Sequence, residues 1–228
     1  MLQKEQQAQK AYRERFDTGQ TYTRAKEIPD DAKSICLWRK GASHKGISQL
    51  NGLSHLTAVS VNDDFIREIS TLESLDSLVL SKVKVSSIES LANLRQLRYL
   101  RFDRLSPCEG LETVRDMVGL RKLWFSNCKD ITDFSFLTGA DRIVALGIEG
   151  DIWNTQNIDS LKPLTRLKSL EALFMSSVRL TDKHISCMAS APLLKYFCVS
   201  RFAPKSEFEE LHRKRPDMVC QWFTEYDV

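Results

Sequence analysis

No apolar run in this sequence approaches the length of a membrane span, and its first ten residues, MLQKEQQAQK, are polar and charged. A signal peptide requires an apolar stretch near the start, so we expect a cytoplasmic protein with no membrane association. Six cysteines are scattered along the chain, and none forms a CxxC pair. This spacing argues against a disulfide framework and against a zinc site, and predicts six reduced thiols.

No strong excess of charge of one sign is present, because 33 Lys and Arg against 30 Asp and Glu give a net charge of +3. A dedicated nucleic-acid-binding protein usually carries a concentrated basic stripe. The one local basic cluster, at residues 212–215, is short and is interpreted as the solvated end of a helix.

Motifs for metal binding, phosphate binding and catalysis are missing as well. The four histidines lack metal-ligand spacing, and the acidic pairs at 30–31 and 63–64 do not fit a calcium loop. No glycine-rich loop opens a helix. Cys36 and Cys198 are predicted to point out of the concave sheet, but nothing nearby in sequence would lower the pKa of their thiols. We therefore expect no metal, no cofactor and no enzymatic activity.

The chain does contain a repeated leucine motif, LxxLxxLxL, for example in Leu72–Leu80 and Leu94–Phe102. If the seventh position is taken as a marker, the steps between copies are 24, 19, 22, 23, 23, 27 and 24 residues. These periods are typical of leucine-rich repeats. The marker residues are Ile35, Val59, Leu78, Leu100, Leu123, Leu146, Leu173 and Phe197.

Such repeats predict an α/β protein, a right-handed leucine-rich-repeat solenoid with a parallel sheet on its concave side. The alternation L-x-L within each repeat predicts a short strand with leucines pointing inward and the intervening residues pointing outward. About 15 to 20 residues remain between strands, which leaves room for short helices or 3₁₀ segments on the convex side.

Three regions are expected: residues 1–34, residues 35–205 with the repeats, and residues 206–228. The first is interpreted as a capping helix, or alternatively as a partly disordered arm. Its weak apolar stripe at helical spacing consists of Leu2, Ala8, Ala11, Tyr12 and Phe16 and ends near Thr18.

The third region is interpreted as a C-terminal cap. Ser206 and Glu209 form a capping-box pattern that predicts a helix beginning at Ser206. A final strand is expected over residues 218–222, with Met218, Cys220 and Trp222 facing the core.

The stretch SIESLANLRQL, Ser87–Leu97, resembles the short bacterial and phosphatase-regulator type of leucine-rich repeat, including internalins. The resemblance covers most of residues 35–223 and implies the fold and a bacterial source, whereas this fold serves many partners. The chain departs from the family where an asparagine usually ties adjacent turns together. The residues at that position are Asp64, Val83, Leu105, Cys128, Asp151, Val178 and Phe202. Apolar packing is therefore expected to hold the turns.

The outward residues of the predicted strands form a candidate binding surface in the concave groove. Its middle and later part gathers Tyr, Trp and Arg, the residue types that dominate interface energetics. The candidate partner-binding residues are Trp38, Tyr99, Arg101, Asp103, Arg104, Lys122, Trp124, Glu149, Phe174 and Tyr196. In the alternative interpretation, Trp124 and Phe174 only shield the sheet. Trp153, in the insertion of the longest repeat, either rims the groove or folds back over the core.

These patterns predict a non-enzymatic protein-binding module that engages one protein partner in its groove. The specific hypothesis is an inhibitor or immunity protein that occludes a toxin or enzyme. The alternative is an adaptor or assembly subunit that bridges two partners. A less favoured hypothesis is RNA binding by aromatic side chains interleaved with Arg101, Arg104, Lys122 and Arg201. Asp103, Glu149 and the small net charge weigh against RNA.

Overall fold

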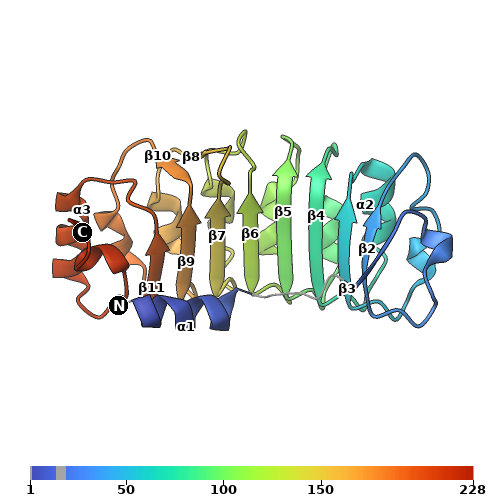
Figure 1. Ribbon diagram of the computed structural model, residues 1–228, viewed down its shortest axis with the longest axis horizontal. Helices are drawn as coiled ribbons and strands as arrows, with labels where there is room; N and C mark the ends of the chain where they lie inside the picture. The colour runs from blue at the N-terminus through green and yellow to red at the C-terminus, as the bar shows by residue number, and fades with distance from the viewer. Residues whose placement is uncertain (1, 14–18, 228) are drawn as a thin grey trace. The chain divides into compact units, whose positions relative to one another are not determined.

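The computed structural model describes residues 2–13 and 19–227. They belong to two compact units. One, residues 15–128, is called here the N-terminal unit. The other, residues 1–14 with 129–228, is called the C-terminal unit (Figure 1).

Each unit contains part of a series of short parallel strands. In the N-terminal unit these are β1 (Gln20–Tyr22), β2 (Ser34–Trp38), β3 (His55–Val59), β4 (Ser77–Val83), β5 (Tyr99–Leu105) and β6 (Lys122–Ser126). In the C-terminal unit they are β7 (Ala145–Glu149), β8 (Gln156–Ile158), β9 (Ala172–Ser176), β10 (Val178–Leu180) and β11 (Tyr196–Val199). Strands β1 to β6 pair in sequence order, β7, β9 and β11 pair in that order, and β8 pairs with β10.

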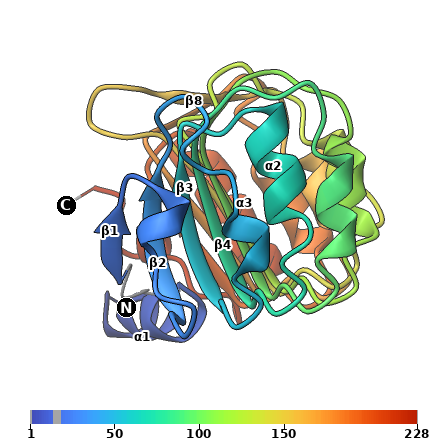
Figure 2. The same ribbon diagram turned by 90° about the vertical axis from the view of Figure 1, so that its right-hand side faces the viewer.

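Short helices connect the strands, as the length of the repeats predicts. The α-helices are α1 (Leu2–Tyr12), α2 (Asp63–Ile69) and α3 (Lys205–Lys214). The 3₁₀ helices are η1 (Ala25–Glu27), η2 (Ile47–Gln49), η3 (Glu89–Asn93), η4 (Leu111–Arg115), η5 (Ser135–Leu137), η6 (Lys162–Arg166), η7 (Ser186–Ser190) and η8 (Gln221–Phe223). In the N-terminal unit, α2 covers one face of the sheet, the convex side (Figure 2).

The inward leucines form the core between the sheet and the convex segments. Leu78 pairs with Leu100, and Leu100 pairs with Leu123, and all three side chains are fully buried. Leu146 and Leu173 occupy the same place in the C-terminal unit and are also buried. The leucine spacing therefore predicted the register of these strands correctly.

In the second repeat the predicted register is wrong by three residues. Leu56, not Val59, pairs with Ile35 and with Leu78. The steps become 21 residues from Ile35 to Leu56 and 22 from Leu56 to Leu78, more even than the predicted 24 and 19. The outward residues of this strand are consequently His55, Thr57 and Val59.

Asn62 lies after this strand and directly before α2. Its side chain accepts a hydrogen bond from the Phe65 amide at 3.1 Å and so caps α2. Asp63, in the first turn of α2, accepts a hydrogen bond at 2.7 Å from the amide of Ser86 in the next repeat. Asp63 is therefore a structural link between repeats.

A residue with left-handed backbone conformation recurs near the end of the strand in several repeats. Positive φ values recur two residues after the second inward residue of the strand. They are found at Ser60, Lys82, Arg104, Asn127 and Ser177, with φ between 52° and 64°. Since non-glycine residues rarely adopt this conformation, its recurrence identifies a turn shared by these repeats.

The N-terminal segment contributes two separate elements. Strand β1 pairs with β2 and extends the sheet at the start of the repeats, so β1 is the element that covers the edge of β2. Helix α1 packs against β11 of the C-terminal unit. Phe16, the last residue of the predicted apolar stripe, and Thr18, near which the helix was expected to end, lie outside the described residues.

The C-terminal segment differs from its prediction at two points. Helix α3 begins after Pro204, and no side chain caps it, so the predicted capping box at Ser206 is wrong. Met218 and Cys220 are buried as predicted, but residues 221–223 form η8, and Trp222 is half-buried. The Trp222 indole donates a hydrogen bond to the carbonyl of Val199.

Candidate functional site

The concave face carries the outward residues predicted from the sequence, with the second repeat corrected. In the N-terminal unit, the central ladder reads Cys36, Thr57, Val79, Arg101 and Trp124. In the C-terminal unit it reads Gly147, Phe174 and Cys198. Trp124 therefore lies on the face opposite the leucine core.

The aromatic residues of this face are nevertheless buried. Trp124, Tyr99 and Phe174 are 0%, 2% and 1% exposed. The rings of Tyr99 and Trp124 stack at 5.8 Å between centroids, with an angle of 28°. The expectation of an open groove lined by these three side chains is thus wrong, and the alternative that Trp124 and Phe174 shield the sheet is the one observed. The RNA hypothesis loses its stacking platform for the same reason.

Polar residues next to this aromatic pair join successive repeats. The Asp103 carboxylate accepts hydrogen bonds from the Ser81 hydroxyl at 2.6 Å and from the Asn127 amide at 3.3 Å. The exposed Arg104 guanidinium donates to the same carboxylate at 2.9 Å. Asp103 therefore connects three repeats, a structural role that the sequence did not reveal. Arg101 and Lys122 are half-exposed on the same face.

The concave face of the C-terminal unit is engaged by the end of α1. The Tyr12 ring packs against Tyr196 with 5.7 Å between centroids. Arg13 forms an ion pair with Glu149 at 2.5 Å, and Glu149 is buried. Two of the predicted partner-binding residues, Glu149 and Tyr196, thus contact the protein's own N-terminal segment.

Trp38 is the one predicted concave aromatic residue with a largely open ring, at 47% exposed. It ends β2 and pairs with Val59. The Lys82 ammonium lies 5.6 Å from the centroid of its ring, within the range of a cation–π interaction. Trp38 is therefore an accessible but isolated aromatic residue in the N-terminal unit.

The insertion between β7 and β8 carries the most exposed apolar side chains among the described residues. Ile152 and Trp153 are 86% and 85% exposed. In Figure 2 the segment before β8 projects away from the sheet. Trp153 therefore does not fold back over the core, which was one of its two interpretations. Ile152 was missed by the sequence analysis, because its exposure depends on the conformation of the loop.

This loop is held in place by its own hydrogen bonds. The Asp151 carboxylate accepts hydrogen bonds from the amides of Trp153 and Asn154, both at 2.7 Å. The Asp151 amide donates to the carbonyl of Asn154 at 2.8 Å, and the Gly150 amide donates to Ser176 at 2.9 Å. A Cβ atom on Gly150 would lie 2.1 Å from the Asn154 carbonyl oxygen, so this close turn requires glycine. The loop is a preformed platform for Ile152 and Trp153.

The six cysteines, all within the described residues, form no disulfide. Cys36 and Cys198 lie on the outward face of the sheet as predicted, but both are buried, and burial raises the pKa of each thiol. Burial also raises the pKa of Cys108 and Cys187 to about 11. A raised pKa leaves little of the reactive thiolate at neutral pH.

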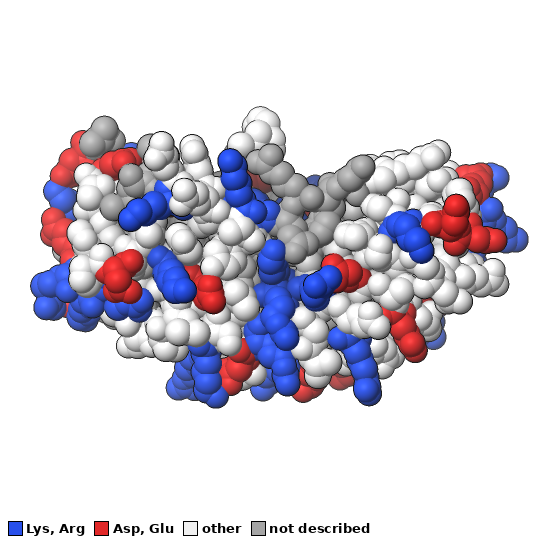
Figure 3. Space-filling view, turned by 90° about the horizontal axis from the view of Figure 1, so that it is seen from below, with Lys and Arg blue, Asp and Glu red and all other residues white. Residues whose placement is uncertain are grey.

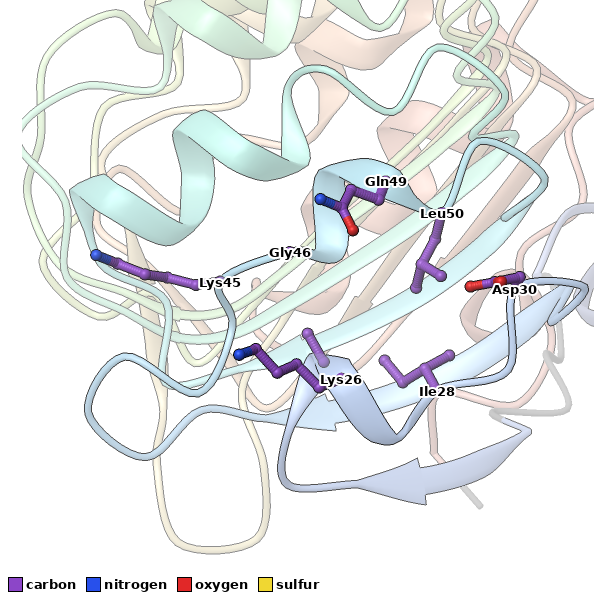
Figure 4. Close-up of a pocket in the computed structure, with 8 residues that line it drawn as sticks. Lys26, Ile28, Asp30, Lys45, Gly46, Gln49 and Leu50 are labelled. Atoms are coloured by element: carbon purple, nitrogen blue, oxygen red, sulfur yellow. The ribbon is translucent and has the colours of Figure 1, made fainter.

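A hollow of about 520 Å³ lies between η1 and η2 in the N-terminal unit (Figure 4). Ile28 and Leu50 face one another across it, and Lys26, Lys45 and Gln49 lie at its rim. None of the sequence-predicted site residues lines this hollow.

Charge is mixed over the edge of the sheet where the strands begin. Figure 3 views this edge and shows acidic side chains interspersed with basic ones. Arg98, next to β5, pairs with Asp76. Arg121, next to β6, donates to the carbonyls of Val118, Gly119 and Leu120 at 3.0 to 3.2 Å. These arginines are therefore engaged with the protein's own acceptors.

Among the described residues, no three His, Cys, Asp or Glu side chains gather as a metal site would require. None of the helices that the described residues form has the length and apolar character needed to cross a membrane.

No protein-family model matches the sequence, and no curated protein matches it. Among solved structures, an internalin from Listeria monocytogenes is 22% identical, with a TM-score of 0.48; the match covers 82% of this chain and 60% of that chain. Internalin C2 from the same organism is 19% identical, with a TM-score of 0.49, over 75% of this chain and 70% of that chain. A plant peptide hormone receptor in complex with RGF2 is 14% identical, with a TM-score of 0.45, over 82% of this chain and 34% of that chain. The stacked parallel strands and their buried leucines show that this chain has the leucine-rich-repeat fold.

Proposed function

We propose that this protein is a non-enzymatic protein-binding module and that the loop tip formed by Ile152 and Trp153 anchors its partner. The observation that carries the proposal is the exposure of these two adjacent side chains, at 86% and 85%, on a hydrogen-bonded loop. Tryptophan is enriched among the residues that dominate binding energy. Because the loop is preformed, little conformational entropy is lost when a partner covers it.

The state of the potential nucleophiles and bases supports a role in binding over a role in catalysis. Burial raises the pKa of the cysteine thiols, as described above for Cys108 and Cys187. Burial lowers the pKa of His44, and its ring packs against Phe65 at 5.0 Å. His184 lies 3.2 Å from the carboxylate of Glu207, which also accepts hydrogen bonds from two backbone amides. These side chains are therefore engaged in structural contacts.

The finer proposal is that binding occludes the partner, as an inhibitor or immunity protein acting on a toxin or enzyme in the cytoplasm does. A projecting tryptophan suits insertion into an apolar cleft, and an enzyme's cleft is the part whose obstruction stops its activity. The adaptor alternative requires a second apolar surface. The other exposed large apolar side chains among the described residues are the isolated Trp38, Val118 and Leu193.

Affinity capture from the source cells tests the proposal. The baits are the parent protein, Trp153→Ala and, as a matched control, Leu193→Ala, which truncates an exposed apolar side chain elsewhere. We expect a protein captured by the parent and by the control but lost with Trp153→Ala. With that partner purified, Trp153→Ala should weaken binding by about 2 kcal/mol or more, roughly 30-fold in Kd.

Equal capture by all three baits contradicts the assignment of the anchor. Inhibition of the captured partner's own activity supports occlusion. Simultaneous binding of two different proteins supports the adaptor alternative instead.

A further inference from the structure

Helix α1 lies across the starts of β7, β9 and β11 within the C-terminal unit and is fastened near both ends (Figure 1). Near its beginning, the Glu5 carboxylate accepts a hydrogen bond from the Gln221 amide at 2.6 Å. At its end, the Tyr12 hydroxyl donates to Glu171 at 2.5 Å. The next residue, Arg13, pairs with Glu149 at 2.5 Å. These three contacts are polar and specific in position.

The surface beneath α1 suits a helix. Ala145 pairs with Ala172 on the outward side of β7 and β9, and Gly147 follows at the next outward position. Such small side chains let a helix approach a sheet closely, and both alanines are fully buried. Two carboxylates, those of Glu149 and Glu171, stand on this surface and favour a ligand with a cation and a hydroxyl donor.

By contrast, α1 buries little apolar surface of its own in this contact. Among its described side chains, only Ala8 is fully buried. The others are exposed or half-exposed, and the exposed ones are Gln3, Lys4, Gln6, Gln7, Lys10 and Ala11. An isolated helix of this length is marginal in water, so α1 depends on its contacts with the C-terminal unit. Because few apolar contacts hold α1 in place, another helix can replace it on this surface.

We propose that this surface is a receptor for a short helix that ends in a tyrosine followed by a basic residue, and that α1 is its intramolecular occupant. A protein partner with such a helix binds by taking the place of α1, while the loop tip at Ile152 and Trp153 adds its anchor. The binding of a protein partner rests on the proposed function. The existence of a helix-binding surface does not, because α1 of the same chain already occupies it.

The tether sets the scale of the competition. A helix that belongs to the same chain as its binding surface competes at an effective concentration on the order of 1 mM. If α1 is in place more than nine-tenths of the time, its Kd as a separate peptide lies below about 100 µM, and the resident raises the apparent Kd of any competitor about tenfold or more.

The test is binding of a fluorescent synthetic peptide of residues 1–14 to the full chain, measured by anisotropy. The receptor variant is Tyr12→Ala/Arg13→Ala, which loosens the resident helix but leaves the sheet intact. Lys4→Ala/Lys10→Ala is the matched control, because it removes two exposed side chains from the same helix. We expect the peptide to bind the loosened variant at least tenfold more tightly than it binds the parent or the control.

A peptide that itself carries Tyr12→Ala/Arg13→Ala should not bind the loosened variant. Amide exchange of residues 2–12 should be faster in that variant than in the parent, with the strands unchanged, which confirms that the variant is folded. The proposal that this surface binds a helix is contradicted if the peptide binds all three proteins equally. It is also contradicted if the peptide binds none of them although α1 is released in the variant. Neither outcome depends on the natural partner, so the capture experiment with Trp153→Ala stands or fails separately.

Discussion

The guanidinium of Arg13 lies 2.5 Å from the carboxylate of Glu149, although 136 residues separate them in sequence. Glu149 is the last residue of β7, and its side chain is only 6% exposed. The ion pair therefore forms against the sheet with limited access to water, where screening by solvent is weaker than at an open surface. One consequence is that a residue predicted to meet a partner already meets the N-terminal segment of its own chain.

Trp124→Ala should destabilise the fold, although the side chain points away from the leucine core. The ring is fully buried and stacks on Tyr99, so its removal leaves a cavity as a core truncation does. We expect a loss of about 3–5 kcal/mol in the free energy of unfolding, measured by urea denaturation. Trp38→Ala, an exposed tryptophan of the same unit, should change the free energy of unfolding by less than about 1 kcal/mol. Similar stability of Trp124→Ala and the parent would contradict the burial of this ring.

The sequence analysis placed Trp124 among the candidate partner-binding residues, so its burial could not be predicted from the sequence. The LxxLxxLxL spacing fixes which residues point outward, and Arg101 and Trp124 do pair on the outward face. Whether an outward side chain meets water depends on contacts between segments far apart in the chain. The leucine spacing of the repeats carries no information about such contacts.

The second repeat shows the limit of the spacing itself. Leu53, Leu56 and Val59 are spaced by three residues, so the sequence fits the repeat equally well in two frames. The structure chooses Leu56, because Asn62 caps α2 and the strand must end before it. Asn62 was the available signal in the sequence, because a residue that caps a helix marks the end of the preceding strand.

The candidate site was predictable only in part. Trp153 was identified from the length of its insertion, but both of its orientations were left open. What fixes its exposure is the Asp151 carboxylate with the close turn at Gly150. The position of α1 was not predictable, because its sequence is mostly polar and its contacts, such as that of Tyr12 with Glu171, are long-range.

Asp151→Ala should loosen the loop without unfolding the protein. The substitution removes the acceptor for the amides of Trp153 and Asn154 but leaves both exposed apolar side chains in place. Hydrogen exchange of residues 150–156 should become at least tenfold faster, whereas the melting temperature should stay within a few degrees of the parent. If preorganisation matters for binding, the purified partner should bind this variant more weakly, with Trp153 still present. Unchanged exchange in the loop would show that Asp151 does not hold it.

The thiols should react slowly and only at high pH. Cys108 and Cys187 are the two half-exposed cysteines, and each has a pKa of about 11 because burial disfavours the thiolate. At pH 8 the thiolate fraction is roughly two orders of magnitude below that of a thiol with the ordinary pKa of about 8.5. Reaction of the native protein with a disulfide reagent should therefore accelerate about tenfold per pH unit from pH 7.5 to 9.5. A rate that levels off near pH 9 would contradict the raised pKa values.

His44 should make the N-terminal unit sensitive to mild acid. Its ring is 2% exposed and lies 5.0 Å from the ring of Phe65, and burial lowers its pKa below the ordinary value. Arg39 lowers the pKa further, whereas the charges of Glu68 and Asp64 oppose the shift. In the unfolded chain the imidazole takes up a proton near its ordinary pKa of about 6.5, before the folded protein does.

Between these two pKa values the unfolded state binds more protons, so the free energy of unfolding falls as the pH drops below about 6.5 and is level above it with respect to this group. His44→Gln removes the titration. From pH 7.5 to pH 5, the parent should therefore lose more stability in urea denaturation than His44→Gln loses. His212→Gln replaces a half-exposed histidine that stacks on Phe223, and it is measured alongside as the matched control for the substitution itself. Parallel pH profiles for the parent and His44→Gln would show that the buried imidazole does not contribute to the response.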